Sequence, residues 1–335
     1  MWHSSLYRWY ESHRRELPWR ETSDPYKIWL SEVILQQTRV AQGMEYYLRF
    51  TSHWPDVRQL AEAKEDAVLR EWQGLGYYSR ARNLHRAAQQ IVAEYNQPDG
   101  RVLFPDTFEG LRRLPGVGDY TAGAIASFAY DLPYPAIDGN VLRVLARLND
   151  CDTPIDSTAG KKEFRQMAID MMDTAHPRLF NSAIMELGAL QCTPQNPECE
   201  SCPLKLRCQA YAHGTVALLP IHKQRPPLHD RWLNYSIYID PSGKTLIHKR
   251  EGNDIWHHLW EFPLEEREEL VTDERADRAL DYTHILSHRR LHARFLIYKV
   301  DVLPAVADTI AVGLDELDDY AFSRLSLRAM QDLGL

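Results

Sequence analysis

The chain has 335 residues, more than one typical domain, and its hydrophobic (44%) and charged (26%) fractions are those of a globular protein. This composition excludes a disordered or fibrous chain. The formal net charge is −8, and neither residues 1–219 nor the remainder is basic. Binding to nucleic acid would therefore need a local basic face. No apolar run reaches the roughly 20 residues of a membrane-spanning helix, and the N-terminus has no secretory signal.

Residues 1–215 have apolar side chains at the three- and four-residue spacing of helices. Asp24 before Pro25 predicts a capped helix start. The segment Asp106-Thr-Phe-Glu109 resembles a capping box with Asp106 as the cap. Breaks between helices are predicted at two glycine pairs, Gly74-Leu-Gly76 and Gly116-Val-Gly118.

The pattern changes after residue 215. Residues 216–231 are basic and rich in proline, which is typical of a semi-extended linker. Beyond them, apolar residues alternate with period two, and Asp240-Pro-Ser-Gly243 predicts a β-hairpin turn between strands 235–239 and 244–249. Another strand is expected at 292–300 and a closing helix at 323–333. We therefore expect a multidomain protein with an all-α domain over 1–215 and a smaller α+β domain over 232–335.

Four of the five cysteines lie close together, at Cys192, Cys199, Cys202 and Cys208. A disulfide framework spreads its cysteines along a chain, so this cluster indicates a metal site. Zinc is one candidate, but zinc modules usually place two short cysteine pairs far apart in sequence. A single loop with unequal gaps suits a cubane iron–sulfur cluster better, and we favour that. Cys151 lies outside the group and is interpreted as a small buried hydrophobe.

A glycine turn precedes an apolar helix in the segment Leu114-Pro-Gly-Val-Gly-Asp-Tyr-Thr-Ala122. Its backbone N–H groups would point outward beside a helix N-terminus, which forms a site for a phosphate oxygen. An ordinary turn between two helices explains the segment equally well.

Two carboxylates are candidates for acid–base chemistry. The helical neighbours of Glu32 are largely apolar, so burial would raise its pKa as a general acid requires. The alternative is a Glu that reaches solvent. Asp138 precedes a helical run and is interpreted as its N-cap, a role that still allows one oxygen to face a cleft.

The segment from Gly74 to Arg86 contains three Arg, two adjacent Tyr and no acidic residue. Arginines contact phosphates, and an aromatic side chain on a turn can wedge between bases. A solvated helix face would account for the arginines, although it leaves the Gly-Tyr-Tyr sequence unexplained.

Together these features resemble the adenine DNA glycosylases (the MutY family) of the helix–hairpin–helix DNA glycosylase superfamily. The resemblance runs from about Leu17 to the C-terminal strands. Its specific segments are Leu17–Arg20, Glu32–Val40, Gly74–Arg80, Leu114–Ala122, Ile137–Val141 and the four-cysteine loop.

The resemblance implies hydrolysis of the N-glycosidic bond of adenine mispaired with 8-oxoguanine or guanine, after the base is flipped out of the duplex. Glu32 would protonate adenine N7 and Asp138 would stabilise the oxocarbenium-like sugar, as paired carboxylates do in glycoside hydrolysis. Tyr120 and Asn140 are implied to line the sugar and orient Asp138. The other implied contacts are Trp19 and Arg20 beside adenine, and Leu35, Gln37, Thr38, Leu75, Tyr77, Arg80, Gly116 and Gly118 toward the DNA.

Tyr120 also bears on the reaction type. In relatives that nick the strand, the residue two positions after the second hairpin glycine is Lys, whose amine forms a Schiff base with the sugar. Tyr cannot, so we expect a monofunctional glycosylase that leaves an abasic site. Two alternatives stay open: a bifunctional glycosylase/AP lyase of the endonuclease III type, and a non-enzymatic iron–sulfur DNA-binding protein or redox sensor.

The C-terminal part resembles the Nudix-like domain that reads the 8-oxoguanine strand in this family. It has no complete Nudix metal box, so we expect no pyrophosphatase activity. The family's Phe-Ser-His loop is Leu286-Ser287-His288 here, which removes one aromatic ring. The expected cofactor is a [4Fe-4S] cluster. The expected partner is double-stranded DNA containing adenine opposite 8-oxoguanine, bound by a monomer in the cytoplasm, on the bacterial nucleoid and not on a membrane.

Overall fold

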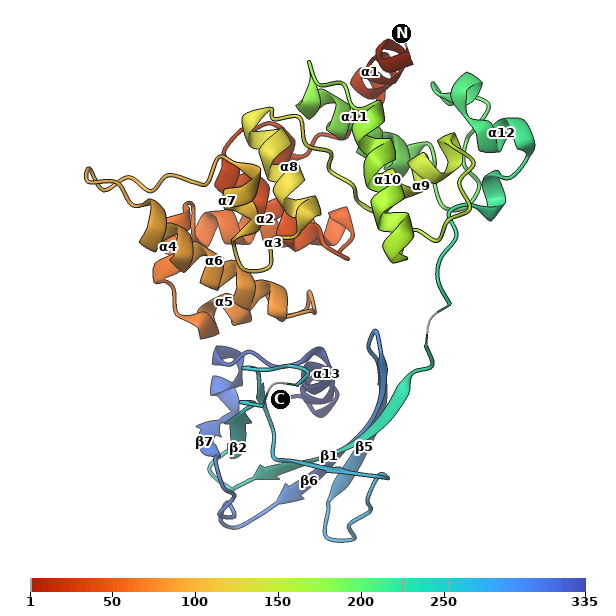
Figure 1. Ribbon diagram of the computed structural model, residues 1–335. Helices are drawn as coiled ribbons and strands as arrows, with labels where there is room; N and C mark the ends of the chain where they lie inside the picture. The colour runs from red at the N-terminus through yellow and green to blue at the C-terminus, as the bar shows by residue number, and fades with distance from the viewer. Residues whose placement is uncertain (1, 225, 253) are drawn as a thin grey trace. The chain divides into compact units, whose positions relative to one another are not determined.

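The computed structural model describes residues 2–224, 226–252 and 254–335, and the chain divides into two compact units (Figure 1). Unit 1 combines the residues up to 61 with residues 86–224. Unit 2 combines residues 62–85 with the residues beyond 225. Among the described residues, no helix is both long and apolar enough to span a bilayer.

Unit 1 is helical, which confirms the predicted fold class of the first part of the chain. Two of its helices, α4 (Val57–Glu62) and α6 (Ser79–Tyr95), continue into unit 2 at one end. The helices are α1 (Trp2–His13), α2 (Pro25–Leu35), α3 (Val40–His53), α4 (Val57–Glu62), α6 (Ser79–Tyr95), α7 (Phe108–Arg112), α8 (Asp119–Tyr130), α9 (Gly139–Leu148), α10 (Thr158–Met171), α11 (Pro177–Leu190) and α12 (Gln209–His213), with short 3-10 turns η1 (Pro18–Arg20), η2 (Lys205–Arg207) and η3 (Val216–Leu218).

Two groups of helices build unit 1. In one, α2 packs against α3 and α8, and α8 continues from α7 through the predicted glycine turn. In the other, α11 packs against α1 and α9, and α9 also contacts α10 and α12. Buried residues of this second group, such as Leu6, Val144 and Ile184, form one core that the cysteine loop joins at its edge. Since α11 also contacts α8, the two groups meet there.

The helix starts follow from capping. As predicted, Asp24 caps α2, accepting a hydrogen bond from the Tyr26 N–H at 3.0 Å, with Pro25 as the first helical residue. The predicted cap at Asp106 is wrong. Thr107 caps α7 instead, because its hydroxyl accepts from the Gly110 N–H at 3.1 Å.

Unit 2 contains two β-sheets around a core of residues such as Tyr235, Phe262 and Phe295. A four-stranded sheet has the order β4-β1-β6-β5, in which β1 and β6 run parallel, and a three-stranded sheet has the order β3-β2-β7. The elements are α5 (Glu65–Glu71), β1 (His229–Ile239), β2 (Lys244–Lys249), β3 (Trp260–Glu261), β4 (Leu264–Arg267), β5 (Arg278–Ile285), β6 (Arg289–Lys299), β7 (Ile310–Gly313), η4 (Leu314–Asp319) and α13 (Arg324–Leu333).

The second domain is therefore α+β, as predicted, and the strand at 292–300 and the closing helix are present as β6 and α13. The predicted hairpin at Asp240–Gly243 is wrong in one respect. The turn forms, with Asp240 N–H donating to the Lys244 carbonyl at 3.1 Å, but β1 and β2 belong to different sheets.

The first residues of the predicted linker, which covers residues 216–231, are ordered. Residues 216–218 form η3, and the Ile221 carbonyl accepts from the Ile155 N–H at 3.0 Å, which holds this segment to unit 1. The domain limits at residues 215 and 231 remain predictions.

Candidate active site

Glu32 lies on α2 and faces a pocket of about 880 Å³ in unit 1. It is buried, with only 6% of its surface exposed. Burial raises the pKa of Glu32 to about 7, an effect that a hydrogen bond from Tyr120 opposes and the nearby Asp138 reinforces. Glu32 therefore has the properties of a carboxylic acid that holds its proton near neutral pH, as predicted from its apolar helical neighbours.

Tyr120 is presented by the glycine turn between α7 and α8. Gly116 has φ +75°, a left-handed conformation that favours glycine, and Gly118 caps α8 so that Tyr120 lies in its first turn. The Tyr120 hydroxyl donates a short hydrogen bond to Glu32 Oε2. Burial and the neighbouring carboxylates raise the pKa of Tyr120, so it remains a neutral donor. The two glycines themselves do not line the pocket.

Asp138 lines the same pocket and caps α9. Its Oδ1 accepts from the Val141 N–H at 2.7 Å, and its Oδ2 accepts from Asn140 Nδ2 at 2.7 Å. Burial raises the pKa of Asp138, while these hydrogen bonds and the Arg143 charge act in the opposite direction. Asp138 thus caps a helix and lines the pocket at the same time, and Asn140 is hydrogen-bonded to it.

A chain of hydrogen bonds runs from Asn140 to the cysteine loop. Arg143 Nη2 donates to Asn140 Oδ1 at 2.9 Å and to the Gly188 carbonyl at 2.7 Å. Its Nε donates to the Cys192 carbonyl at 2.7 Å. The orientation of Asp138 therefore depends on a guanidinium that is also held by the loop containing the four cysteines.

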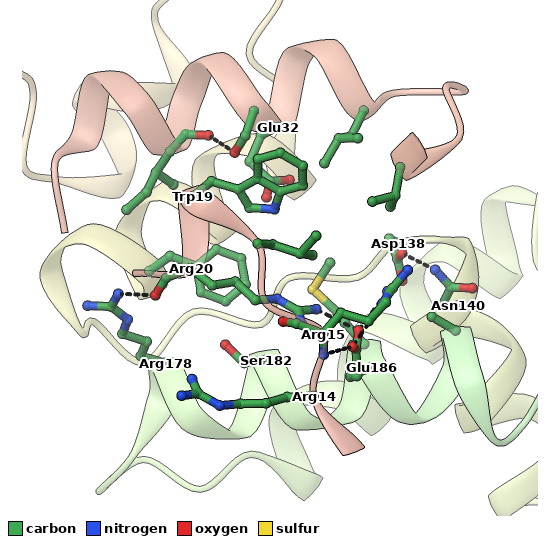
Figure 2. A pocket seen from close by; sticks show the side chains of 18 of the residues that line it. Arg14, Arg15, Trp19, Arg20, Glu32, Asp138, Asn140, Arg178, Ser182 and Glu186 are labelled. Atoms are coloured by element: carbon green, nitrogen blue, oxygen red, sulfur yellow. Dashed lines mark hydrogen bonds and ion pairs between the residues drawn. The ribbon is translucent and has the colours of Figure 1, made fainter. Parts of the chain in front are cut away.

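Sequence reasoning missed the second carboxylate network in this pocket, which surrounds Glu186 on α11. Glu186 is completely buried and accepts from Arg15 Nη2 at 2.7 Å and from Arg20 Nη2 at 2.6 Å. These guanidiniums hold the pKa of Glu186 at about 2. Figure 2 shows Arg15, Arg20 and Glu186 together in the pocket that also contains Glu32 and Asp138. A single Glu inside the apolar run Ile184-Met-Glu-Leu187 is the signal that could have identified it.

Other residues predicted for the site also line this pocket. Trp19 and Arg20 come from η1, which follows Leu17, and both line the pocket. Leu35, Gln37 and Thr38 line it from the end of α2 and the turn beyond. Gln37 has φ +57°, an uncommon conformation for a residue other than glycine and one often found at functional sites.

The remaining predicted DNA contacts lie in unit 2. Leu75, Tyr77 and Arg80 belong to its 62–85 segment, and Leu286, Ser287 and His288 form the turn between β5 and β6. The two groups meet, because the Tyr77 hydroxyl lies 2.8 Å from Ser287 Oγ. Sequence reasoning assigned these residues to separate domains, whereas the structure places them in one unit.

The four clustered cysteines line a second, small cavity of about 30 Å³. Among the described residues, no three His, Cys, Asp or Glu side chains gather closely enough to hold a single metal ion. The buried guanidinium of Arg147 adds positive charge beside them, with Nη1 at 3.3 Å from Cys192 Sγ.

Comparison with known proteins identifies both parts of the chain. Residues 30–167 match the family model of the HhH-GPD superfamily base excision DNA repair protein, and residues 234–332 match the NUDIX domain. A thermostable thymine-DNA glycosylase superposes with a TM-score of 0.56 at 26% identity, covering 63% of this chain and 94% of that one. An endonuclease III–DNA complex at 22% identity, with a TM-score of 0.53, shares the fold.

Several adenine DNA glycosylases are similar in sequence to this chain. The adenine DNA glycosylase of Buchnera aphidicola subsp. Schizaphis graminum is 32% identical over 302 residues, which cover 86% of this chain and 84% of the relative. The mouse adenine DNA glycosylase is 42% identical over 243 residues, and the human one is 43% identical over 215. The matched regions span 46% and 38% of these mammalian proteins, and 69% and 62% of this chain. The chain therefore belongs to the adenine DNA glycosylase family, within the HhH-GPD superfamily of base excision DNA repair proteins.

Proposed function

We propose that the protein is a monofunctional DNA glycosylase that hydrolyses the N-glycosidic bond of adenine opposite 8-oxoguanine, or less readily opposite guanine, and leaves an abasic site. The observation that carries this proposal is the single pocket that contains Glu32 and Asp138. Its volume of about 880 Å³ is sufficient for an extruded nucleotide.

The two carboxylates have different tasks in this mechanism. Glu32 is protonated near neutral pH and donates its proton to adenine N7, which makes the base a neutral leaving group. Asp138 acts as the ionised partner. Positive charge that develops on the deoxyribose favours its carboxylate form, which the Val141 and Asn140 hydrogen bonds already stabilise. Water then completes the hydrolysis at the sugar.

Arg20 and Trp19 provide the adenine side of the pocket in this proposal. Arg20 is fixed by its ion pair with Glu186, so its guanidinium has a defined position before the base arrives. Arg15 completes the pairing of Glu186 and prevents an uncompensated buried charge.

DNA binding outside the pocket would use three surfaces. The turn at Gly116–Gly118 offers backbone N–H groups to a phosphate. The turn containing Leu75 and Tyr77, to which Arg80 is hydrogen-bonded, would contact the stacked bases. Leu286, Ser287 and His288 would contact the strand that holds 8-oxoguanine, with one aromatic ring fewer than the family pattern. We expect the protein to bind this duplex as a monomer in the cytoplasm.

The pocket chemistry favours a monofunctional enzyme over a glycosylase/lyase. Tyr120 occupies the position of the Schiff-base lysine, and the described pocket lining includes no lysine. Borohydride treatment during the reaction is expected to trap no covalent protein–DNA adduct, whereas trapping as efficient as that of a true lyase would favour the endonuclease III-type alternative.

We also propose that Cys192, Cys199, Cys202 and Cys208 hold a [4Fe-4S] cluster. All four line one cavity, and one loop with unequal gaps suits a cubane cluster better than the two separated cysteine pairs of common zinc modules. When bound, the cluster would cross-link the loop next to α9. Iron and sulfide in the purified protein, lost in Cys199→Ser, would support the assignment, and stoichiometric zinc would refute it.

Single-turnover adenine release from duplexes with 8-oxoguanine, guanine or cytosine opposite adenine tests the activity itself. We expect the fastest release opposite 8-oxoguanine and almost none opposite cytosine. Binding of all three duplexes without base release would instead support the non-enzymatic alternative.

A further inference from the structure

The turn that carries Tyr77 has an unusual backbone. Gly74, Gly76 and Tyr77 all have positive φ values, of 96°, 72° and 48°. Glycine adopts this conformation without strain, but tyrosine does not. Tyr77 is also half exposed, with 50% of its surface accessible, so its conformation is not imposed by burial of its own ring. Other groups must hold the turn.

The inner side of the turn is held by two side chains of the same segment. Trp72 Nε1 donates to the Gly76 carbonyl at 3.1 Å, and Arg80 Nη2 donates to the same carbonyl at 3.2 Å. The Arg80 guanidinium lies 5.1 Å from the centre of the Trp72 ring and 5.7 Å from that of Tyr77. These contacts shape the turn locally but do not attach it to the rest of unit 2.

Besides the contact between the Tyr77 hydroxyl and Ser287, the turn is attached through the two residues that flank it, both of which bind the backbone of Phe322 in the C-terminal part. The Tyr78 hydroxyl donates to the Phe322 carbonyl at 3.1 Å and accepts from the Gly74 N–H at 3.4 Å. On the other side of the turn, Gln73 Oε1 accepts from the Phe322 N–H at 3.0 Å. The backbone of Phe322 thus binds both ends of the turn, Tyr78 through its carbonyl and Gln73 through its N–H.

Phe322 is a rigid anchor. It is completely buried and its ring stacks on Phe262, with centroids 5.7 Å apart, inside the core of unit 2. Tyr78 is buried as well, with 5% of its surface exposed. The positions of both flanks are therefore determined by a packed core, which holds side chains far more tightly than an exposed loop does.

We propose that Tyr78 and Gln73 are positioning residues that fasten the Tyr77 turn to Phe322, so that the C-terminal part of the chain sets the place of Tyr77 before DNA binds. This inference rests on the proposed function, in which Tyr77 contacts the stacked bases. A turn that is already ordered loses less conformational entropy on binding, so loosening it weakens binding without removing any group that touches DNA.

The test measures the Kd of the full-length protein for a duplex with a tetrahydrofuran abasic analogue opposite 8-oxoguanine. Tyr78→Phe keeps the buried ring and removes only the hydroxyl, and we expect a Kd about tenfold higher, because DNA binding must then order the loosened turn. Gln73→Ala is expected to do the same. Gln73→Glu retains an acceptor oxygen for the Phe322 N–H, so this variant should keep most of the wild-type affinity.

A double-mutant cycle with Tyr77→Ala separates positioning from a general loss of structure. If Tyr78 acts through Tyr77, adding Tyr78→Phe to Tyr77→Ala raises the Kd by less than about twofold. The matched control is Tyr26→Phe, which removes a hydroxyl that donates to the Trp54 carbonyl at 2.6 Å in unit 1 and should leave the Kd within about twofold of wild type. Thermal unfolding of each variant confirms that it is folded.

Wild-type affinity in Tyr78→Phe and Gln73→Ala would overturn the inference, and so would a full tenfold effect of Tyr78→Phe in the Tyr77→Ala background. Adenine release by the wild-type protein is measured in parallel. No release by wild type contradicts the proposed function, whereas release by wild type with unchanged binding by the variants contradicts only this inference.

Discussion

Two glutamates in one pocket have opposite electrostatic properties. Burial without a full counter-charge raises the pKa of Glu32 to about 7, and two guanidiniums hold that of Glu186 at about 2. At neutral pH, a large fraction of Glu32 is therefore protonated, whereas Glu186 is ionised. This difference supports the proposed roles, in which Glu32 donates a proton to the base and Glu186 fixes Arg15 and Arg20.

The raised pKa of Glu32 predicts the pH dependence of adenine release. The rate should be lost as pH rises through about 7, by about tenfold per pH unit beyond it, because the acid form disappears. The Tyr120 hydrogen bond lowers the pKa of Glu32, so Tyr120→Phe should move this alkaline limb to higher pH. Single-turnover rates over a pH series check both points, and a rate that increases above pH 7 would contradict the assignment.

Glu186→Gln should destabilise the protein. The amide leaves Arg15 and Arg20 without their buried counter-charge, which costs about 3 kcal/mol of unfolding free energy by the usual size of such effects. Because the folded pKa of Glu186 is depressed, its contribution is present above pH 4.5, the ordinary value, and is lost as pH falls toward 2. Urea unfolding at pH 7 measures the loss. The exposed pair Arg14–Glu21 provides the control, since Glu21→Gln should change stability by less than about 1 kcal/mol.

Local sequence predicted the burial and the raised pKa of Glu32 correctly, because its neighbours on α2 are apolar and are buried with it. The same reasoning applied to Glu186 would have predicted a raised pKa, the wrong direction. Its partner Arg15 is 171 residues away in sequence, so the deciding charge is a product of the tertiary fold. Residue type and local surroundings therefore predict burial, but they do not predict which buried acid is paired.

At the scale of elements, the site depends on the close approach of α11 to the start of α9. Gly188 makes this possible. A Cβ at Gly188 would lie 2.7 Å from Asn140 Cβ and 2.9 Å from the Asn140 carbonyl oxygen, closer than real Cβ atoms come. Asn140 in turn orients Asp138. The separation of these two helices thus sets the geometry of Asp138, the carboxylate proposed to stabilise the sugar.

Gly188→Ala should therefore reduce both stability and adenine release. We expect a loss of about 1–3 kcal/mol, the usual cost of overpacking, with a rate at least tenfold lower because Asn140 must move. Gly252→Ala is the control, since a Cβ there meets no heavy atom within 4 Å. An active Gly188→Ala protein with wild-type stability would show that the helices can separate without disturbing Asp138.

The elements themselves were largely predictable, and the errors have physical reasons. Asp138 and Asp24 were identified as caps because each directly precedes an apolar helical run. Asp106 and Thr107 are both good caps one residue apart, and only the position of the first turn of α7 selects Thr107. The tight turn after β1 was also predicted from the sequence. The placement of β1 and β2 in different sheets depends on partner strands that are distant in sequence.

At the scale of the whole molecule, the unexpected feature is that residues 62–85 fold with the C-terminal part of the chain. Besides Phe322, this segment is attached through the ion pair Lys249–Asp66 and a hydrogen bond between His258 and Glu65. Its helical periodicity predicted the elements but carries no information on which unit they join. The consequence is that the proposed DNA contacts at Tyr77 and Ser287 belong to one unit.

Net charge leads to a prediction at the same scale. The protein carries a formal charge of −8, so attraction to DNA must come from local contacts between cations and phosphates. Such contacts release counterions, and the logarithm of affinity should fall linearly with the logarithm of salt concentration. Binding titrations from low to moderate salt measure the slope. Affinity that does not depend on salt would contradict phosphate contacts altogether.

The most direct test of the central claim is adenine release by Glu32→Gln on a duplex with adenine opposite 8-oxoguanine. Gln has the shape of Glu but no acidic proton, so we predict a rate at least about 100-fold lower, the usual contribution of a general acid, with duplex affinity unchanged. Glu261→Gln, a change at another buried glutamate, in unit 2, should retain the wild-type rate. Release by Glu32→Gln at the wild-type rate would contradict the account.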